Sequence, residues 1–181
     1  MEAMMRLFIA LEPSAELREA LLEVQNRLRA AGVTARYYDP AQLHMTLAFI
    51  GQWPQDITAL LPAVEQPFPV VLSHLGVFPR ANVLWAGVKP CDALERLAAR
   101  VRHALEEAAI PFDHQPFCPH ITLGRKPVIP EGMRLAEIAV PPIAMTAGEV
   151  CLYRSERREN GMVYTVIGRG ASAASPQEES K

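Results

Sequence analysis

The sequence contains one internal repeat, and this restricts the chain to folds built from two equivalent halves. Each half begins with a short apolar run, LFIAL from Leu7 and LWAGV from Leu84. An amphipathic segment follows, and then the motif His-x-Thr-Leu, at His44 and at His120. The run and its histidine lie 37 positions apart in the first half and 36 in the second. Unrelated segments would rarely agree in order and spacing, so we interpret them as a duplicated strand–helix–strand unit.

The segments between the strands have the pattern of helices. Ser14 and Asp92 each precede a run of leucines and valines at helical spacing, and we expect them to be N-caps. Duplicated units predict two lobes related by pseudo-symmetry, with the two histidines facing each other across one cleft. The segment 171–181 is rich in Ala, Ser and Glu, and we expect it to be a disordered tail.

Both histidine motifs have the alternation of a half-buried strand. Side chains alternate between the two faces of a strand, so His44 and Thr46 share one face. His120 and Thr122 share a face in the same way. The residue between each pair, Met45 in the first motif and Ile121 in the second, points to the opposite face of its strand. One such motif indicates little, because most isolated histidines are structural. Two at equivalent places in a repeat favour a functional site.

Two facing imidazoles suit the chemistry of phosphoryl displacement. One neutral imidazole can take a proton from a nucleophile while a protonated one gives a proton to the leaving oxygen. The hydroxyls of Thr46 and Thr122 can donate to the non-bridging oxygens, where charge develops in the transition state. No Ser or Cys stands in a nucleophile-elbow context. The motifs contain no HExxH and no acidic residue, so we expect neither a metal ion nor another cofactor.

The composition of the chain limits the kinds of partner it can bind and the cellular compartment it is suited to. The formal net charge is −2, so a broad basic surface for nucleic acid is not expected, and any RNA contact should be confined to an end or a single phosphate. The three cysteines are far apart and form no CxxC pair, which favours reduced thiols in a cytoplasmic protein. We expect no signal peptide and no membrane span, and we expect a monomer.

Several segments together resemble the 2H phosphoesterase superfamily, which is named for its two His-x-Thr/Ser-x motifs. Within it the chain is similar to the RNA 2′,3′-cyclic phosphodiesterases, long called 2′–5′ RNA ligases. The resemblance extends from about Arg6 to Gly168 and rests on RLFIAL, LHMTLAFIG, FPR, LWAGV, PFCPHITLGR and LYRSE. It implies a single bilobal α+β domain over 1–170, with the repeat at roughly 6–51 and 83–125. Antiparallel sheets would line a central cleft, with the helices outside.

The resemblance also implies an activity and two further site residues. The activity is metal-free hydrolysis of RNA 2′,3′-cyclic phosphate to a 2′-phosphate, with a weak and reversible 2′–5′ ligation. Tyr37 stands where relatives often have Trp, and it could stack on a base. Such a base would place the ribose beside His44, which predicts His120 as general base and His44 as general acid. Arg125 matches an arginine that relatives use near the phosphate, although strict alternation from His120 would turn it to the buried face.

Other functions remain open at this point. The same chemistry could act on a small cyclic nucleotide such as ADP-ribose 1″,2″-cyclic phosphate. The chain could also be a nucleotide-binding module without turnover, although such a module would be expected to lose one of the four motif residues. The physiological partner could be the cyclic-phosphate end of a tRNA half or of another RNA.

Overall fold

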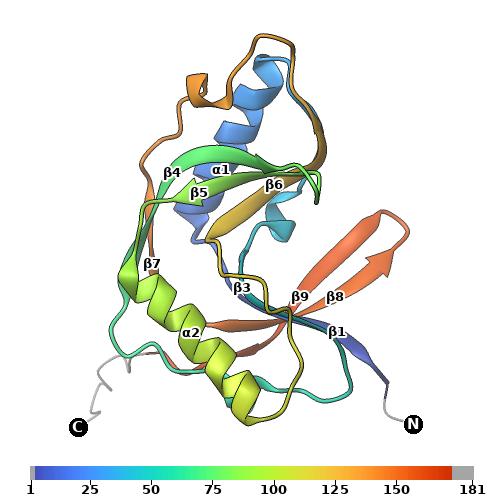
Figure 1. The fold of residues 1–181 in the computed structure, drawn as a ribbon, viewed down its shortest axis with the longest axis vertical. Helices are drawn as coiled ribbons and strands as arrows, with labels where there is room; N and C mark the ends of the chain where they lie inside the picture. The colour runs from blue at the N-terminus through green and yellow to red at the C-terminus, as the bar shows by residue number, and fades with distance from the viewer. Residues whose placement is uncertain (1–2, 173–181) are drawn as a thin grey trace, which may run out of the picture.

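The computed structural model describes residues 3–172, and this part of the chain folds into two antiparallel sheets with two α-helices (Figure 1). The strands are β1 (Met5–Leu11), β2 (Thr34–Tyr37), β3 (Met45–Trp53), β4 (Phe68–Phe78), β5 (Val83–Val88), β6 (His120–Val128), β7 (Ala144–Ala147), β8 (Cys151–Arg158) and β9 (Gly161–Arg169). The helices are α1 (Ala15–Ala30) and α2 (Asp92–Glu107), and the short 3-10 turns are η1 (Pro40–Gln42), η2 (Thr58–Leu60) and η3 (Leu135–Glu137). The predicted α+β class with two antiparallel sheets is confirmed.

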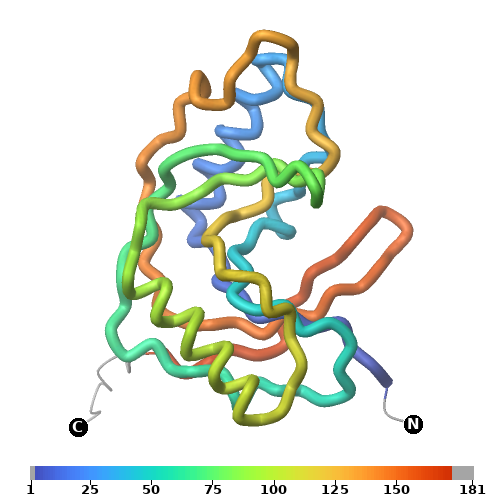
Figure 2. Tube along the Cα trace, viewed as in Figure 1, coloured from blue at the N-terminus to red at the C-terminus, as the bar shows by residue number. Residues whose placement is uncertain are grey.

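The two sheets show the duplication in their strand order. The first sheet has the order β3-β1-β8-β9 and the second has the order β2-β6-β5-β4-β7. In each sheet the strand that opens the repeat pairs antiparallel with the strand of its own histidine motif, β1 with β3 and β5 with β6. The strands β3 and β6 also contact each other where the sheets meet (Figure 2). The two motifs therefore lie at equivalent places on adjoining sheets.

Each helix crosses from the sheet where its repeat begins to the other one. Helix α1 follows β1 of the first sheet but contacts β2 and β7 of the second. Helix α2 follows β5 of the second sheet and packs mainly on β3 of the first, with a smaller contact to β4 of the second (Figure 1). A lobe therefore combines elements of both repeats, and one continuous apolar core joins the two lobes.

The helices bury the faces that the spacing predicts. In α1 the apolar stripe of Leu17, Leu21, Val24 and Leu28 is fully buried. Ser14 is the N-cap of α1, as predicted, and its hydroxyl accepts a hydrogen bond from the Leu17 N–H at 3.2 Å.

Two boundaries differ from those expected. The N-cap of α2 is Cys91 in extended conformation, so the prediction for Asp92 was wrong by one position. Asp92 instead lies in the first helical turn, where its negative charge complements the helix dipole. At the other end, Ala171 accepts a hydrogen bond from the Val64 N–H, and Ser172 forms a bridge with Val64. Ordered structure thus extends two residues into the predicted tail, and 173–181 lie outside the described residues.

Candidate active site

The two motif histidines are held by equivalent hydrogen bonds. Nδ1 of His44 donates to the Gln42 carbonyl oxygen at 2.7 Å, and Nδ1 of His120 donates to the Cys118 carbonyl oxygen at 2.7 Å. In each case the acceptor belongs to the residue two positions earlier. A carbonyl oxygen can only accept, so Nδ1 carries the proton of the neutral ring and Nε2 keeps its lone pair. Both imidazoles are therefore fixed in the tautomer that a general base needs.

An aromatic ring from the opening strand of the repeat packs on each histidine. The ring of Phe8 lies 4.6 Å from that of His44, measured between centroids. Trp85, at the equivalent position of the second repeat, lies 6.3 Å from His120. Tyr153 and Tyr164 complete the surroundings of His44. We call the sheet surfaces that carry these side chains the histidine faces.

Burial lowers the pKa of both histidines. It lowers the pKa of His44 to about 4, an effect that the Gln42 hydrogen bond opposes and the nearby charge of His120 reinforces. The pKa of His120 is also lowered by burial and partly restored by the Cys118 carbonyl. The strands of the two histidine motifs, β3 and β6, contact each other, and this places the two rings within electrostatic reach. Both imidazoles are thus neutral near pH 7 in the free protein.

The motif threonines lie on the histidine faces. Thr46 is paired with Ala10, which is in the same cluster as Phe8. Thr122 is paired with Trp85, which contacts His120. Cross-strand partners point to the same side of a sheet, so each hydroxyl lies on the same face as its histidine.

A β-bulge follows each motif and turns the next side chains over. Thr46 and Ala48 face consecutive residues of β1, so Leu47 is the extra residue. Thr122 and Gly124 likewise face consecutive residues of β5, with Leu123 inserted between them. A bulge reverses the alternation of the residues beyond it.

The bulges bring two side chains back to the histidine faces. In β3 the side chain that returns beyond Leu47 is that of Phe49. Strict alternation would bury it, but Phe49 is paired with Phe8 and so lies on the histidine face. Beyond Leu123 it is Arg125, whose Nε donates to the Tyr38 hydroxyl at 3.0 Å. The bulge thus removes the conflict between alternation and a phosphate role for Arg125.

Helix side chains fix both bulges from behind. Nε2 of Gln25 donates to the carbonyl of Leu123 at 2.9 Å and to that of Tyr38 at 3.0 Å. Nε of Arg102 donates to the carbonyl of Leu47 at 3.2 Å. Each donor is the eleventh residue of its helix, so the two contacts are equivalent in the repeat. The repeat therefore includes the support of the bulges as well as the histidines.

Tyr37 does not lie with the other predicted site residues. Its hydroxyl donates to the Val33 carbonyl at 2.7 Å, and the guanidinium of Arg29 in α1 lies 4.3 Å from its ring centroid. The ring thus packs on the helix side of the second sheet, and this placement gives no support to base stacking or to the acid–base assignment that depended on it.

The next residue, Tyr38, joins the two lobes instead, and sequence reasoning missed it. Its hydroxyl accepts a hydrogen bond from Nε of Arg125, and its ring centroid lies 6.3 Å from that of Tyr164. Tyr164 in turn packs edge-on against His44, with ring centroids 5.2 Å apart. Alternation along β2 was the available signal, since Tyr37 and Tyr38 must face opposite sides.

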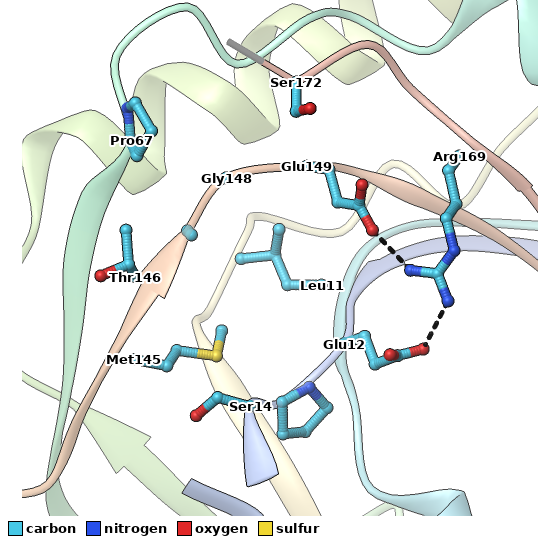
Figure 3. Close-up of a pocket in the computed structure, with 12 residues that line it drawn as sticks. Leu11, Glu12, Ser14, Pro67, Met145, Thr146, Gly148, Glu149, Arg169 and Ser172 are labelled. Atoms are coloured by element: carbon cyan, nitrogen blue, oxygen red, sulfur yellow. Dashed lines mark hydrogen bonds and ion pairs between the residues drawn. The ribbon is translucent and has the colours of Figure 1, made fainter. Parts of the chain in front are cut away.

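Two cavities of the described chain are not lined by His44 or His120 themselves. One of about 340 Å³ lies between the end of β1, the end of β7 and the end of β9, and there Arg169 is held between Glu12 and Glu149 (Figure 3). Another, of about 400 Å³, adjoins Tyr153 and Tyr164.

Within residues 3–172, no three His, Cys, Asp or Glu side chains are grouped closely enough to hold a metal ion. The helices of this part are too short or too polar to cross a membrane.

Comparisons with known proteins agree with this arrangement. The family model described as "2'-5' RNA ligase superfamily" matches residues 13–159. An RNA 2′,3′-cyclic phosphodiesterase of Thermus thermophilus is 35% identical over 90% of this chain and 88% of its own length. One of Thermotoga maritima is 28% identical over 90% of this chain and 93% of its own.

Solved structures show the same fold. A crystal structure of a Thermus thermophilus protein superposes with a TM-score of 0.74 at 34% identity and covers 94% of this chain and 99% of the other. LigT of E. coli in complex with 3′-AMP gives a TM-score of 0.76 at 28% identity and covers 95% of this chain and 100% of the other.

Proposed function

Because the chain belongs to the 2′-5′ RNA ligase superfamily, we propose that it hydrolyses 2′,3′-cyclic phosphate ends of RNA to 2′-phosphates, with His44 and His120 as the acid–base pair. The observation that supports this most directly is the pair of equivalent Nδ1 hydrogen bonds, which leaves Nε2 of both rings available for proton transfer. Relatives that bear this enzyme name match about nine tenths of the chain.

The proposed reaction needs one proton transfer on each side of phosphorus. Water attacks opposite the 3′ oxygen, one imidazole takes a proton from the water, and the P–O3′ bond breaks as the other imidazole protonates the leaving oxygen. The product carries a 2′-phosphate and a free 3′-hydroxyl. If a 5′-hydroxyl of RNA replaces water and attacks the phosphorus of the 2′,3′-cyclic phosphate, the P–O3′ bond breaks in the same way and a 2′–5′ bond forms, which is the weak and reversible ligation expected from the resemblance.

The other residues on the histidine faces would stabilise the phosphate. The hydroxyls of Thr46 and Thr122 donate to the non-bridging oxygens, and the guanidinium of Arg125 supplies positive charge. A bound phosphate anion raises the pKa of both histidines, because an opposite charge favours the protonated ring. This rise lets one of the two carry the proton that the acid needs.

The assignment of His120 as base and His44 as acid stays a prediction. A substrate whose leaving oxygen is replaced by a better leaving group no longer needs the acid. Such a substrate should restore turnover to His44→Ala and leave His120→Ala inactive. Restored turnover of His120→Ala would reverse the assignment.

The activity is tested by incubating the purified protein, with EDTA present, with an oligoribonucleotide that ends in a 2′,3′-cyclic phosphate. We expect a phosphatase-sensitive end that comigrates with a synthetic 2′-phosphate standard and not with the 3′-phosphate isomer. ADP-ribose 1″,2″-cyclic phosphate is assayed in parallel. Faster turnover of that compound would favour a small-nucleotide enzyme, and turnover of neither would favour a binding module. Loss of activity in EDTA that a divalent cation restores would contradict a metal-free mechanism.

A further inference from the structure

Two glycines expose the backbone of β4 and β5 next to His120, and aromatic rings lie over both. Gly76 is paired with Trp85, and Gly87 is paired with His74. A Cβ at Gly76 would overlap the indole of Trp85, and one at Gly87 would lie 2.6 Å from the imidazole of His74. The indole of Trp85 therefore lies along the histidine face of the second sheet, in space that only glycine leaves free, and the imidazole of His74 stands nearly perpendicular to it over Gly87.

Phe78 extends this surface to the catalytic histidine. Its ring lies 5.1 Å from that of Trp85 at 32°, and it meets His120 at 4.9 Å with the rings nearly perpendicular. His74 meets Trp85 edge-on at 5.5 Å. We call Phe78, Trp85 and His74 the aromatic shelf. Phe78 and Trp85 are half-buried and His74 is exposed, so the shelf keeps accessible aromatic surface beside His120.

The aromatic surface beside His44 is different. Phe8 is 3% exposed and Tyr153 is 4% exposed, so these rings support the histidine from below and offer little surface to a ligand. Phe49 is more open, but the guanidinium of Arg6 lies 4.8 Å from its ring centroid. Tyr164 is half-buried and meets His44 edge-on at 5.2 Å, as a single ring. The larger open aromatic surface, made of three adjacent rings, therefore adjoins His120.

We propose that the aromatic shelf stacks the nucleobase of the nucleoside that lies on the His120 side of the phosphate. This inference rests on the proposed function, because it takes the phosphate to be bound between the two histidines. The ribose would then span the gap between phosphate and base, and the centroids of Trp85 and His120 are 6.3 Å apart. Stacking accepts any base, since every base has a π-face, so the shelf would strengthen binding without imposing a sequence.

The two tryptophans of the chain allow the contact to be observed directly. The sequence has only Trp53 and Trp85, so Trp53→Phe leaves the shelf indole as the sole tryptophan emitter. The probe is a 2′–5′-linked adenosine dinucleotide, which has a nucleoside on both sides of its phosphate. Fluorescence of Trp53→Phe should fall over the same concentrations at which the dinucleotide inhibits hydrolysis of the cyclic end. Trp85→Phe should show no such change, and inorganic phosphate should quench neither variant.

A kinetic comparison gives an independent readout. Trp85→Leu should raise KM by roughly fivefold or more, since stacking on one aromatic contributes on the order of 1–3 kcal/mol. The affected KM is that for the cyclic-ended oligonucleotide in hydrolysis or that for the 5′-hydroxyl strand in ligation. The kcat should stay near the wild-type value, and Trp85→Phe should restore most of the lost affinity. Trp53→Leu is the matched control, because the indole nitrogens of both tryptophans are buried without a hydrogen-bond partner.

The outcomes separate this inference from the proposed function. If the wild type does not hydrolyse the cyclic end, the proposed function is wrong. If it does, and the dinucleotide inhibits without quenching Trp85 or fails to inhibit at all, the shelf does not hold a base. Unchanged KM values in Trp85→Leu for both strands would overturn the inference as well.

Discussion

A histidine that transfers protons needs one ring nitrogen fixed and the other free. His44 and His120 meet this requirement in the same way, through a backbone carbonyl two residues earlier. A main-chain acceptor cannot titrate, so the ring orientation survives changes of pH that would protonate a carboxylate partner. This device does not depend on the identity of the preceding side chains, which explains why Gln42 and Cys118 can differ.

Removing either imidazole should abolish most of the activity. We expect His44→Ala and His120→Ala each to lower kcat by roughly 100-fold or more, since acid–base groups typically contribute 10²–10⁴. The double variant should lose much less than the product of the two effects, because the pair acts as a unit. Single-turnover hydrolysis of the cyclic end measures both. Near-normal turnover by either single variant would refute the two-histidine mechanism.

The burial of His44 should also affect stability. Its pKa is about 4 in the folded protein and near 6.5 when exposed, so between these values the unfolded chain binds more protons. The stabilising contribution is complete above about pH 6.5 and is lost as the pH falls towards 4, to a total of roughly 3 kcal/mol.

Urea unfolding of the wild type and of His44→Gln between pH 4 and 7 isolates this contribution. The wild type should lose more free energy of unfolding than the variant across that window, since the glutamine does not titrate. Parallel losses in the two proteins would show that His44 is accessible to solvent.

At the scale of the strand, alternation predicts the site only up to the bulge. It places Thr46 with His44 and Thr122 with His120, as the pairing of both strands shows. It fails beyond Leu47 and Leu123, because a bulge adds a residue without any distinctive side chain. The position of Arg125 therefore could not be derived from periodicity. Tyr37 was misplaced for a related reason, since the resemblance gave its position in sequence but not the face it occupies.

Gln25 should be a positioning residue for Arg125. It is 1% exposed, and its amide donates to the bulged carbonyl of Leu123 and to that of Tyr38, the residue that Arg125 contacts. Gln25→Met keeps the shape but leaves buried carbonyls short of a donor, which costs about 1–3 kcal/mol. We expect a lower free energy of unfolding in urea and a raised KM for the cyclic substrate, with a smaller change in kcat.

Gln52→Met is the control for this variant, because Gln52 is exposed on β3. It should change neither the stability nor KM. If Gln25→Met lowered stability and left KM unchanged, its role would be confined to packing. Equal behaviour of the two variants would show that the bulge holds without the helix.

On the scale of the whole molecule, a repeat of the sequence does not correspond to a lobe of the fold, because the helix of each repeat packs mainly on the sheet of the other. The spacing of the repeat is visible in the sequence, and the two sheets reproduce it. The exchange of helices between sheets is not visible, because α1 and α2 are amphipathic in the same way and either sheet could accept either helix. Tertiary contacts such as that of Gln25 with Leu123 select the crossed arrangement. Because the helices cross, both histidines stand on sheets that share one continuous apolar core.

The charge of the whole molecule predicts how its RNA binding responds to salt. With a net charge of −2, the chain offers no extended basic track, and the proposed site holds one phosphate. For single strands the logarithm of affinity falls with that of salt by about 0.7 per neutralised phosphate. Raising KCl from 50 to 200 mM should therefore raise KM for a cyclic-ended 20-mer only about threefold. KM for a dinucleotide that ends in a 2′,3′-cyclic phosphate should rise by the same factor, because the additional phosphates of the 20-mer stay in solvent. A rise of roughly 100-fold for the 20-mer alone would instead indicate several further phosphate contacts along the protein surface.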